Sequence, residues 1–345
     1  MRIDRIHPLT RAPHPELLWA GRDLVAPRGV LAHGAGSLIT TDGRGGVTFI
    51  DPLGERVVHH RGADAMMAHA VLPHGPGSVC LVGARDGAGC VAVLKADGTL
   101  QPLLTAVDGA PLPPVADIAR DGMGRLFITI PTHHAALEDA ARPDVADGMI
   151  VLCPPVGAAR VVARHLHYPA GCVVSADGSQ LFVNETFGRA TIAFDITATG
   201  SLEGPMGLAQ YGDGLFPMGL ADDTEGGLWV SSLVSRTVLR LSPGRGRRLV
   251  LQERDETRVS AVERAFGAFT LTAARLFAPA RARLPDLAGL AFGGPDGGHL
   301  LLGNFDGSAI PILPVDVAGR TPNFPDGFFG PLVAAGVLPA DWPGA

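Results

Sequence analysis

The stretch GCVVSADGSQLFVNETFGRATIAFDI, residues 171–196, decides the fold. It begins with small residues and continues as an apolar strand, an Asp-Gly turn and a second apolar strand. Asp-Gly and Gly-Gly dipeptides supply the positive φ angles of tight hairpin turns, and apolar residues that alternate or run together suit packed sheets. The stretch therefore predicts short antiparallel strands joined by tight turns.

The same pattern recurs along the chain, which makes six units in all. They occupy residues 29–55, 70–98, 115–131, 171–196, 218–244 and 288–313. A unit of short antiparallel strands repeated six times is typical of a β-propeller, in which each blade buries its faces against its neighbours. We therefore predict an all-β, six-bladed β-propeller that forms a single domain over residues 1–345. The strands nearest the axis are expected near 30–33, 69–73, 115–120, 171–175, 218–222 and 288–292.

A propeller ring must close, and an N-terminal strand commonly completes the last blade. Residues 1–27 are the expected source of that strand.

Two segments fall outside the repeat. In residues 247–283, between the fifth and sixth units, apolar residues that include Phe266 and Phe269 recur at steps of three and four. This spacing predicts a helix within 256–278 with these residues on one apolar face. The second segment is the C-terminal extension 314–345, rich in proline, glycine and phenylalanine. Each segment either packs against the ring or covers one mouth of its channel, and the sequence leaves both interpretations open.

The composition and net charge of the chain exclude several classes of function. The 345 residues include 46 glycines and 29 prolines, carry a net charge of −6, and contain Lys95 as the only lysine. An acidic chain of this kind gives no case for binding nucleic acid or anionic membranes, and without further lysines a P-loop is excluded. No apolar run approaches the roughly 20 residues of a membrane span. Four cysteines are no disulfide framework, and the polar N-terminus lacks a secretory pattern, so we expect a cytoplasmic protein.

Common catalytic motifs do not occur in the chain. It has no G-x-S-x-G nucleophile elbow, no H-E-x-x-H zinc helix, no G-x-G-x-x-G dinucleotide fingerprint and no EF-hand loop. A serine hydrolase or a nicotinamide enzyme is therefore not expected.

The repeat resembles the gluconolactonase and regucalcin (senescence marker protein) family of six-bladed propellers. The resemblance is most specific in VVSADGSQLFVNETFGRATIAFDI (173–196), FPMGLADDTEGGLWVSS (216–232) and LAGLAFGGPDGGHLLLGN (287–304). It implies a lactone hydrolase, since family members typically hydrolyse lactones with one divalent cation, often calcium, in the central channel.

The family's metal-site positions carry different residues in this chain. The first-unit glutamate aligns with Arg28, the third-unit asparagine with Ala116, the fourth-unit asparagine with Ala170, and the fifth-unit aspartate with Met218. Calcium prefers six to eight oxygen ligands, and these side chains offer none. The resemblance therefore implies a channel without a metal. The alternative, a calcium or zinc site with misregistered ligands, stays open.

The candidate catalytic residues follow from this comparison. Arg28 replaces the charge of the cation and is suited to a bidentate contact with an anion. Asp117 keeps an aspartate that is present in the family. It is a candidate for proton transfer together with one of the histidines His69, His133 and His134. Each of these side chains also has a purely structural interpretation. The candidate substrate-binding residues are Ala116, Tyr168, Ala170, Phe216, Met218 and Asn304.

Three functions remain open from the sequence. The first is a metal-independent enzyme that acts on a small molecule in the channel by lactone hydrolysis or formation, or by proton-shift isomerisation or cyclisation. The second is a non-catalytic propeller that binds a small molecule, and the third is a divalent-metal-dependent lactonase. A small-molecule substrate is the expected partner, and the sequence leaves the oligomeric state open.

Overall fold

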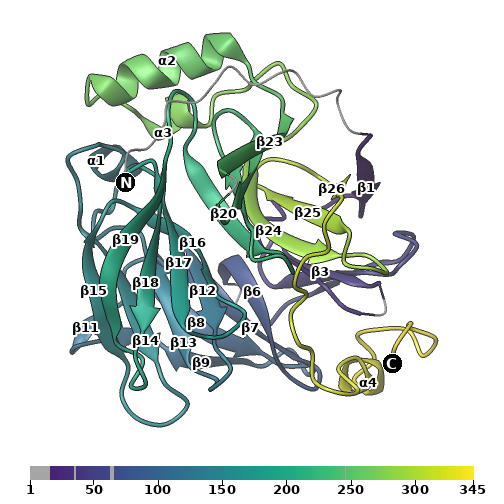
Figure 1. The fold of residues 1–345 in the computed structure, drawn as a ribbon. Helices are drawn as coiled ribbons and strands as arrows, with labels where there is room; N and C mark the ends of the chain where they lie inside the picture. The colour runs from purple at the N-terminus through teal and green to yellow at the C-terminus, as the bar shows by residue number, and fades with distance from the viewer. Residues whose placement is uncertain (1–15, 35, 63–65, 245) are drawn as a thin grey trace.

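Six four-stranded antiparallel sheets stand around a central axis as the blades of a propeller (Figure 1). The computed structural model describes residues 16–34, 36–62, 66–244 and 246–345. The all-β, six-bladed architecture predicted from the repeat is confirmed.

The first three blades follow one another along the chain. Blade 1 comprises β2 (Val30–Ala32), β3 (Leu38–Thr41), β4 (Val47–Ile50) and β5 (Val57–His60). Blade 2 comprises β6 (Met67–Gly75), β7 (Ser78–Arg85), β8 (Ala88–Leu94) and β9 (Leu100–Leu104). A small hairpin, β10 (Ala106–Val107) and β11 (Ala110–Pro111), leads to blade 3. That blade comprises β12 (Asp117–Arg120), β13 (Leu126–Ile130), β14 (Gly148–Cys153) and β15 (Arg160–Leu166), with the short helix α1 (Leu137–Ala140) between its second and third strands.

The last three blades complete the ring. Blade 4 comprises β16 (Pro169–Val174), β17 (Gln180–Glu185), β18 (Ala190–Ile196) and β19 (Leu202–Gln210). Blade 5 comprises β20 (Pro217–Asp222), β21 (Leu228–Ser232), β22 (Thr237–Ser242) and β23 (Gly246–Gln252). Blade 6 comprises β24 (Leu287–Gly293), β25 (His299–Asn304), β26 (Ile310–Pro314) and, from the other end of the chain, β1 (Leu18–Ala20). The six innermost strands are therefore β2, β6, β12, β16, β20 and β24, each overlapping its predicted range.

Side chains on the second strand of a blade tie the innermost strands together. The Thr129 hydroxyl donates to the Ala170 carbonyl at 2.7 Å, the Asn184 amide to the Met218 carbonyl at 3.1 Å, and the Ser231 hydroxyl to the Ala288 carbonyl at 2.5 Å. Each bond crosses from one blade to the next. They satisfy backbone carbonyls that no strand ladder can reach, and so fix the inner wall of the ring.

The ring closes through its ends, as expected. β1 pairs with β26 in antiparallel register, with Leu18 opposite Ile312 and Ala20 opposite Ile310. The expected source, residues 1–27, is thus confirmed for Leu18–Ala20, while residues 1–15 lie outside the described part of the chain.

The helix predicted within 256–278 is confirmed by α2 (Glu256–Gly267), but its apolar spacing does not continue as one helix to Phe277, because the insertion forms a second, short helix. α2 is capped by Asp255, whose carboxylate accepts from the Thr257 and Arg258 amides. Phe269 has a φ of 59°, a left-handed conformation that ends the helix, and the Thr270 amide closes the turn on the Ala265 carbonyl at 2.8 Å. α3 (Ala273–Leu276) begins anew at Thr272.

The C-terminal extension runs to the opposite end of the molecule from α2 (Figure 1). It carries α4 (Gly330–Ala334) and buries Phe328, Phe329 and Trp342 against the first two blades. In the part of the chain that the structure describes, no helix is long and apolar enough to cross a membrane.

Candidate active site in the central channel

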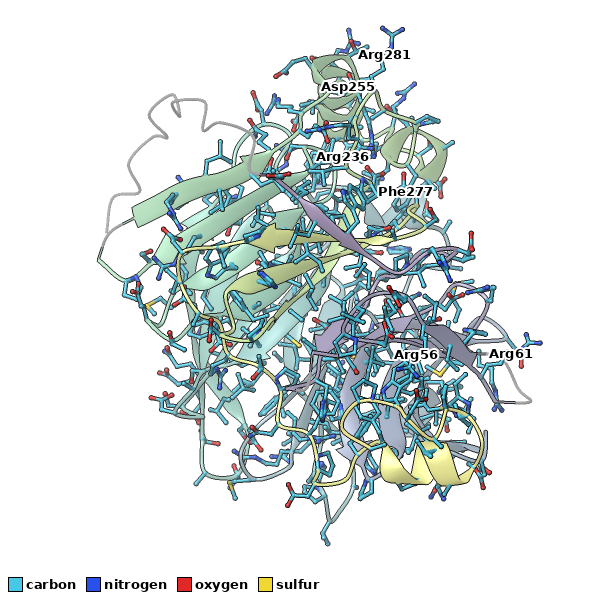
Figure 2. The ribbon with its side chains drawn as sticks, turned by 90° about the vertical axis from the view of Figure 1, so that its right-hand side faces the viewer. Arg56, Arg61, Arg236, Asp255, Phe277 and Arg281 are labelled. Atoms are coloured by element: carbon cyan, nitrogen blue, oxygen red, sulfur yellow. The ribbon has the colours of Figure 1, made fainter. Side chains whose placement is uncertain are left out.

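A cavity of about 920 Å³ follows the propeller axis and is lined by all six innermost strands. Leu276 and Phe277, at the end of α3, border one end, and Arg320–Asn323 of the extension border the other. The two segments outside the repeat therefore each contribute to one mouth as well as to packing. Figure 2 shows Phe277 at the end of the molecule that carries Asp255, Arg236 and Arg281, which we term the upper end.

Bulges at the start of the innermost strands shape the upper part of the cavity. The ladder shifts register between Ala68 and Ala70, between Pro169 and Cys172, between Pro217 and Leu220, and between Leu287 and Leu290. A bulge adds an unpaired residue and turns its side chain. His69, Ala170 and Met218 occupy these bulges and line the cavity.

The four positions that align with the family's metal site all line this cavity. They are Arg28, Ala116, Ala170 and Met218, of which none offers an oxygen ligand. The described residues contain no group of three or more His, Cys, Asp or Glu side chains arranged to hold a metal ion. Among the carboxylate and imidazole side chains that line this part, Asp117 already accepts two backbone N–H groups and His69 lies beside the Arg28 charge. Asp286 is paired with two arginines, and Asp306 accepts from the Asp286 amide. This donor set does not fit a divalent cation.

Arg28 holds a positive charge at the upper end of the channel. The Arg28 carbonyl accepts from the Gly289 amide at 3.0 Å, which fixes its backbone against blade 6. Its guanidinium carbon lies 5.0 Å from the Phe305 ring centroid, and it forms no ion pair with any described residue. Burial lowers the pKa of Arg28, while the nearby Tyr168 phenol acts in the opposite direction. An arginine charge without a carboxylate partner is prepared for an anionic ligand.

Tyr168 faces Arg28 from the opposite side of the ring, since blade 4 lies across from blade 1. It has a φ of 60°, and its ring packs edge-on against Phe187 at 4.7 Å between centroids. Burial raises the pKa of Tyr168 to about 12, with the Arg28 charge opposing the shift. The phenol is therefore protonated at neutral pH and available as a hydrogen-bond donor.

His69 is neutral and oriented. Its Nδ1 lies 2.8 Å from the Val115 carbonyl, which can only accept, so Nδ1 carries the proton and Nε2 remains an acceptor. Burial lowers the pKa of His69 to about 4, and the Arg28 charge adds to that shift. At pH 7 this side chain can accept a hydrogen bond from a hydroxyl group or water.

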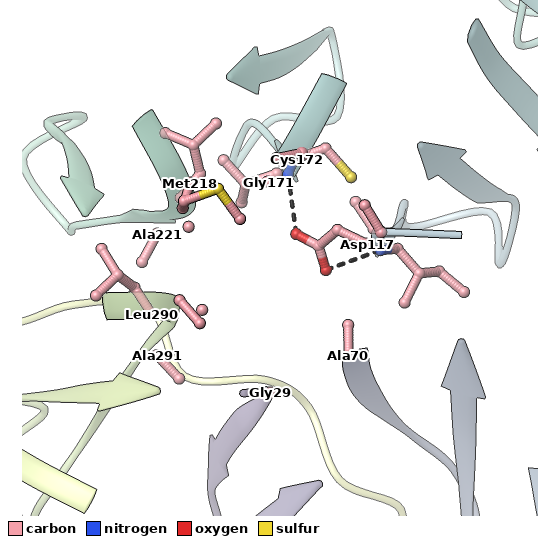
Figure 3. Close-up of a pocket in the computed structure, with 18 of the residues that line it drawn as sticks. Gly29, Ala70, Asp117, Gly171, Cys172, Met218, Ala221, Leu290 and Ala291 are labelled. Atoms are coloured by element: carbon pink, nitrogen blue, oxygen red, sulfur yellow. Dashed lines mark hydrogen bonds between the residues drawn. The ribbon is translucent and has the colours of Figure 1, made fainter. Parts of the chain in front are cut away.

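Asp117 projects from the start of β12 into the open centre of the cavity (Figure 3). One carboxylate oxygen accepts from its neighbour's amide, Ile118, at 2.8 Å, and the other accepts from the Cys172 amide at 3.0 Å. Burial raises the pKa of Asp117 to about 7 against the effect of these two bonds. A carboxyl group with this pKa exchanges a proton readily at neutral pH.

The structure separates the remaining sequence candidates from the cavity. His133 and His134 are exposed on the loop after β13, and His134 lies 3.9 Å from Asp147. Phe216 is fully buried behind the wall, and its ring packs against Phe187. Asn304 is buried at the end of β25, where its side chain accepts from the Gly307 amide and donates to the Ala309 carbonyl. These four residues are not cavity-lining, and the structure gives them structural or surface environments.

Several wall residues were not predicted from the sequence. Phe305 and Phe277 border the upper end, Cys172, Ile118 and Leu290 line the interior, and Arg320 borders the lower end. The positions of Ile118, Cys172 and Leu290 within the innermost strands carried the signal, because alternate residues of such a strand face the axis. Phe277 and Arg320 lie on segments outside the repeat and had no such signal.

A family model described as the SMP-30/gluconolactonase/LRE-like region matches residues 34–268. The chain belongs to this family. The solved structures to which the chain is similar include proteins named gluconolactonase, regucalcin and luciferin-regenerating enzyme. No curated protein sequence matches it.

Three of these structures show the extent of the similarity. The gluconolactonase of Xanthomonas campestris is 18% identical, with a TM-score of 0.62 over 85% of this chain and 87% of that one. The calcium-binding regucalcin of Agrobacterium tumefaciens is 16% identical, with a TM-score of 0.63 over 89% and 97%. A luciferin-regenerating enzyme is 14% identical, with a TM-score of 0.66 over 90% and 99%. Similarity at these identities establishes the fold alone.

Proposed function

We propose that the protein is an enzyme that performs acid–base chemistry on a small carbonyl compound in its central channel without a resident metal ion. The reaction is the opening or closing of a lactone, or a proton shift that isomerises or cyclises the substrate. The observation that carries the proposal is that Asp117, with a pKa of about 7, lies in the same cavity as Arg28, which pairs with no carboxylate among the described residues.

In lactone opening, the Asp117 carboxylate takes a proton from the water molecule that attacks the carbonyl carbon. The electron pair of the C=O bond moves to its oxygen, and the resulting negative charge is stabilised by Arg28 and by the Tyr168 hydroxyl. When the C=O bond re-forms, the ring C–O bond breaks and the leaving oxygen receives the proton from Asp117. The product is a hydroxy acid, and Asp117 returns to its carboxylate form.

A proton shift uses the same groups. Asp117 takes a proton from the carbon beside the carbonyl group, Arg28 and Tyr168 stabilise the enolate oxygen, and the proton returns to another atom of the substrate. His69 orients a substrate hydroxyl group through Nε2. A polarised carbonyl and a base of near-neutral pKa serve either reaction.

Turnover of a panel of simple lactones, with and without a chelator, tests this function. We expect hydrolysis to persist in the presence of chelator and the purified protein to contain no stoichiometric calcium or zinc. Activity that chelation abolishes, together with stoichiometric metal, would favour the metal-dependent alternative. Binding of a ligand that is never turned over would favour the non-catalytic alternative.

Substitution of the two charged groups tests their roles. Asp117→Asn and Arg28→Gln should each lower kcat/KM by roughly 10²–10³, the usual cost of removing one well-placed catalytic group. Asp195→Asn, at an exposed aspartate of β18, is the matched control and should retain full activity. Wild-type rates in both Asp117→Asn and Arg28→Gln would place the chemistry elsewhere.

A further inference from the structure

Arginines lie at both ends of the channel. At the lower end, Arg125 binds Asp121 at 2.6 Å and Arg320 binds Asp222 at 2.6 Å, whereas Arg120 lines the cavity and forms no ion pair with a described residue. Within the described residues, Arg28 at the upper end has no carboxylate partner, and only the Tyr168 phenol opposes the effect of burial on its pKa.

Two carboxylates line the upper wall: Asp306 is exposed and accepts from the Asp286 amide at 2.8 Å, whereas Asp286 is already neutralised. Asp286 is buried, and both Arg258 and Arg236 bind it, each at 2.6 Å. The Nε atoms of both arginines have no hydrogen-bond partner in the described structure. Neither carboxylate forms an ion pair with Arg28 in the described structure, so the Arg28 guanidinium is open to an anionic ligand.

The wall between the two ends is apolar. Five side chains from five different blades face this stretch: Ala70, Ile118, Cys172, Leu220 and Leu290. Burial raises the pKa of the Cys172 thiol well above its usual value, so it behaves as a small apolar group. Figure 3 shows Asp117 as the polar group that projects into the space between Ala70, Met218 and Leu290.

This wall selects against a polyhydroxylated ligand. A hydroxyl group buried in an apolar surrounding without a hydrogen-bond partner weakens binding, because it loses its hydrogen bonds to water. A sugar acid would bring several such groups. From Ala170 to Val174 the apolar stretch rises four residues, about 13 Å at roughly 3.3 Å per residue.

We propose that the channel binds an apolar monocarboxylate, or the lactone that opens to one. Its carboxylate lies on Arg28 and Tyr168, and its apolar body extends along the axis past Asp117. This inference rests on the proposed function, whose substrate class it names. The oxygen that Arg28 stabilises during ring opening becomes an oxygen of the product carboxylate, so one contact serves both states.

Equilibrium binding of saturated fatty acids to the full chain, measured by calorimetry, tests the inference. We expect hexanoate, octanoate and decanoate to bind progressively more tightly, by about two- to fourfold for each added methylene. Gluconate should bind at least 100-fold more weakly than octanoate. Equal affinity for gluconate and octanoate, or no dependence on chain length, would overturn the inference.

Two matched substitutions test the orientation of the ligand. Arg28→Gln should weaken octanoate binding about 10- to 100-fold, since a charge-assisted contact is lost, and should leave 1-octanol binding unchanged. Arg120→Gln removes an arginine that lines the lower part of the same cavity and should leave octanoate binding unchanged. Loss of octanoate affinity in Arg120→Gln but not in Arg28→Gln would overturn the orientation.

Two controls distinguish a loss of octanoate binding from a loss of folding. Arg28→Lys retains a positive charge and should keep octanoate affinity within tenfold of wild type, and circular dichroism checks that each variant is folded. Octanoate binding without turnover of any lactone would support the substrate class and remove the proposed reaction. Turnover of lactones without chain-length dependence in binding would remove the substrate class alone.

Discussion

Two opposing effects act on the Asp117 carboxyl group. The backbone N–H groups of Ile118 and Cys172 stabilise its charged form, whereas its position deep in an apolar channel destabilises that form. Burial has the larger effect, and no arginine forms an ion pair with Asp117 in the described structure. The result is a carboxyl group that is half protonated near pH 7.

This balance predicts the pH dependence of catalysis. Because ring opening requires the carboxylate, kcat/KM should rise about tenfold per pH unit below pH 7 and level off above it. Initial rates on a reactive lactone between pH 5 and pH 9, corrected for spontaneous hydrolysis, measure this profile. A flat profile in the wild-type protein would exclude Asp117 as the base.

The same shift predicts how stability depends on pH. The pKa of Asp117 is about 7 in the folded protein and about 3.9 in an unfolded chain, so the folded state binds the proton more tightly. Its contribution to stability is fully present below about pH 4 and is lost as the pH rises through 7. Between pH 4 and pH 8, wild type should lose about 1–3 kcal/mol of unfolding free energy relative to Asp117→Asn, a value reduced because the Asp117 side chain is only half-buried. Urea unfolding of both proteins at each pH tests the sign.

The site was partly predictable from single residues. Arg28, His69 and Asp117 were predicted because each lies at a repeat position, where the start of an innermost strand faces the axis. His133 and His134 follow a strand of the same blade, but that strand is the second one, and its end leads to the surface. Sequence spacing places a residue on a strand, and it cannot tell whether a loop then turns toward the axis or away from it.

Among the elements, the insertion shows how the end of a helix separates a buried residue from an exposed one. Phe266 of α2 is buried, with its ring 6.0 Å from Phe187 and 5.3 Å from Phe216, whereas Phe269 is 47% exposed. The sequence predicted that both lie on the buried face of one helix. The helix ends between them, because Phe269 adopts the left-handed conformation that usually falls to glycine, and no sequence pattern indicated that turn.

This difference predicts unequal costs for the same substitution. Phe266→Ser should lower the unfolding free energy by about 3–5 kcal/mol, since it leaves a cavity behind the channel wall. Phe269→Ser should cost less than about 1 kcal/mol, with only its contact to Arg142 removed. Thermal unfolding of the two variants checks the ranking, and equal destabilisation would contradict this account of the helix end.

At the scale of the whole molecule, the C-terminal extension 314–345 contributes to the hydrophobic core. Phe328, Phe329, Leu332, Leu338 and Trp342 are buried against blade residues such as Leu31, Phe49 and Leu81. The sequence predicted the ring because its turns recur, but it left the role of this segment open because the segment repeats nothing. Its place depends on an apolar surface that only the assembled blades present.

Removal of residues 324–345 should therefore destabilise the whole ring. Each large buried apolar side chain contributes about 1.5–3 kcal/mol to stability. The loss of five is therefore comparable to the whole unfolding free energy of an ordinary domain. We expect the truncated protein to bind a hydrophobic dye and to aggregate during purification. A truncated protein that melts within a few degrees of the full chain would show that the extension is dispensable.

The pairing of β1 with β26 also governs when the protein can be completed during synthesis. Leu18–Ala20 leave the ribosome long before Ile310–Pro314, so the first strand has no partner while five blades are made. Bringing together segments separated by about 290 residues is slow compared with forming a hairpin, and an unpaired strand edge invites association with other chains. Chaperones should therefore bind nascent chains that are arrested before the last blade. The ring should close, by pairing of β1 with β26, only after the finished chain is released.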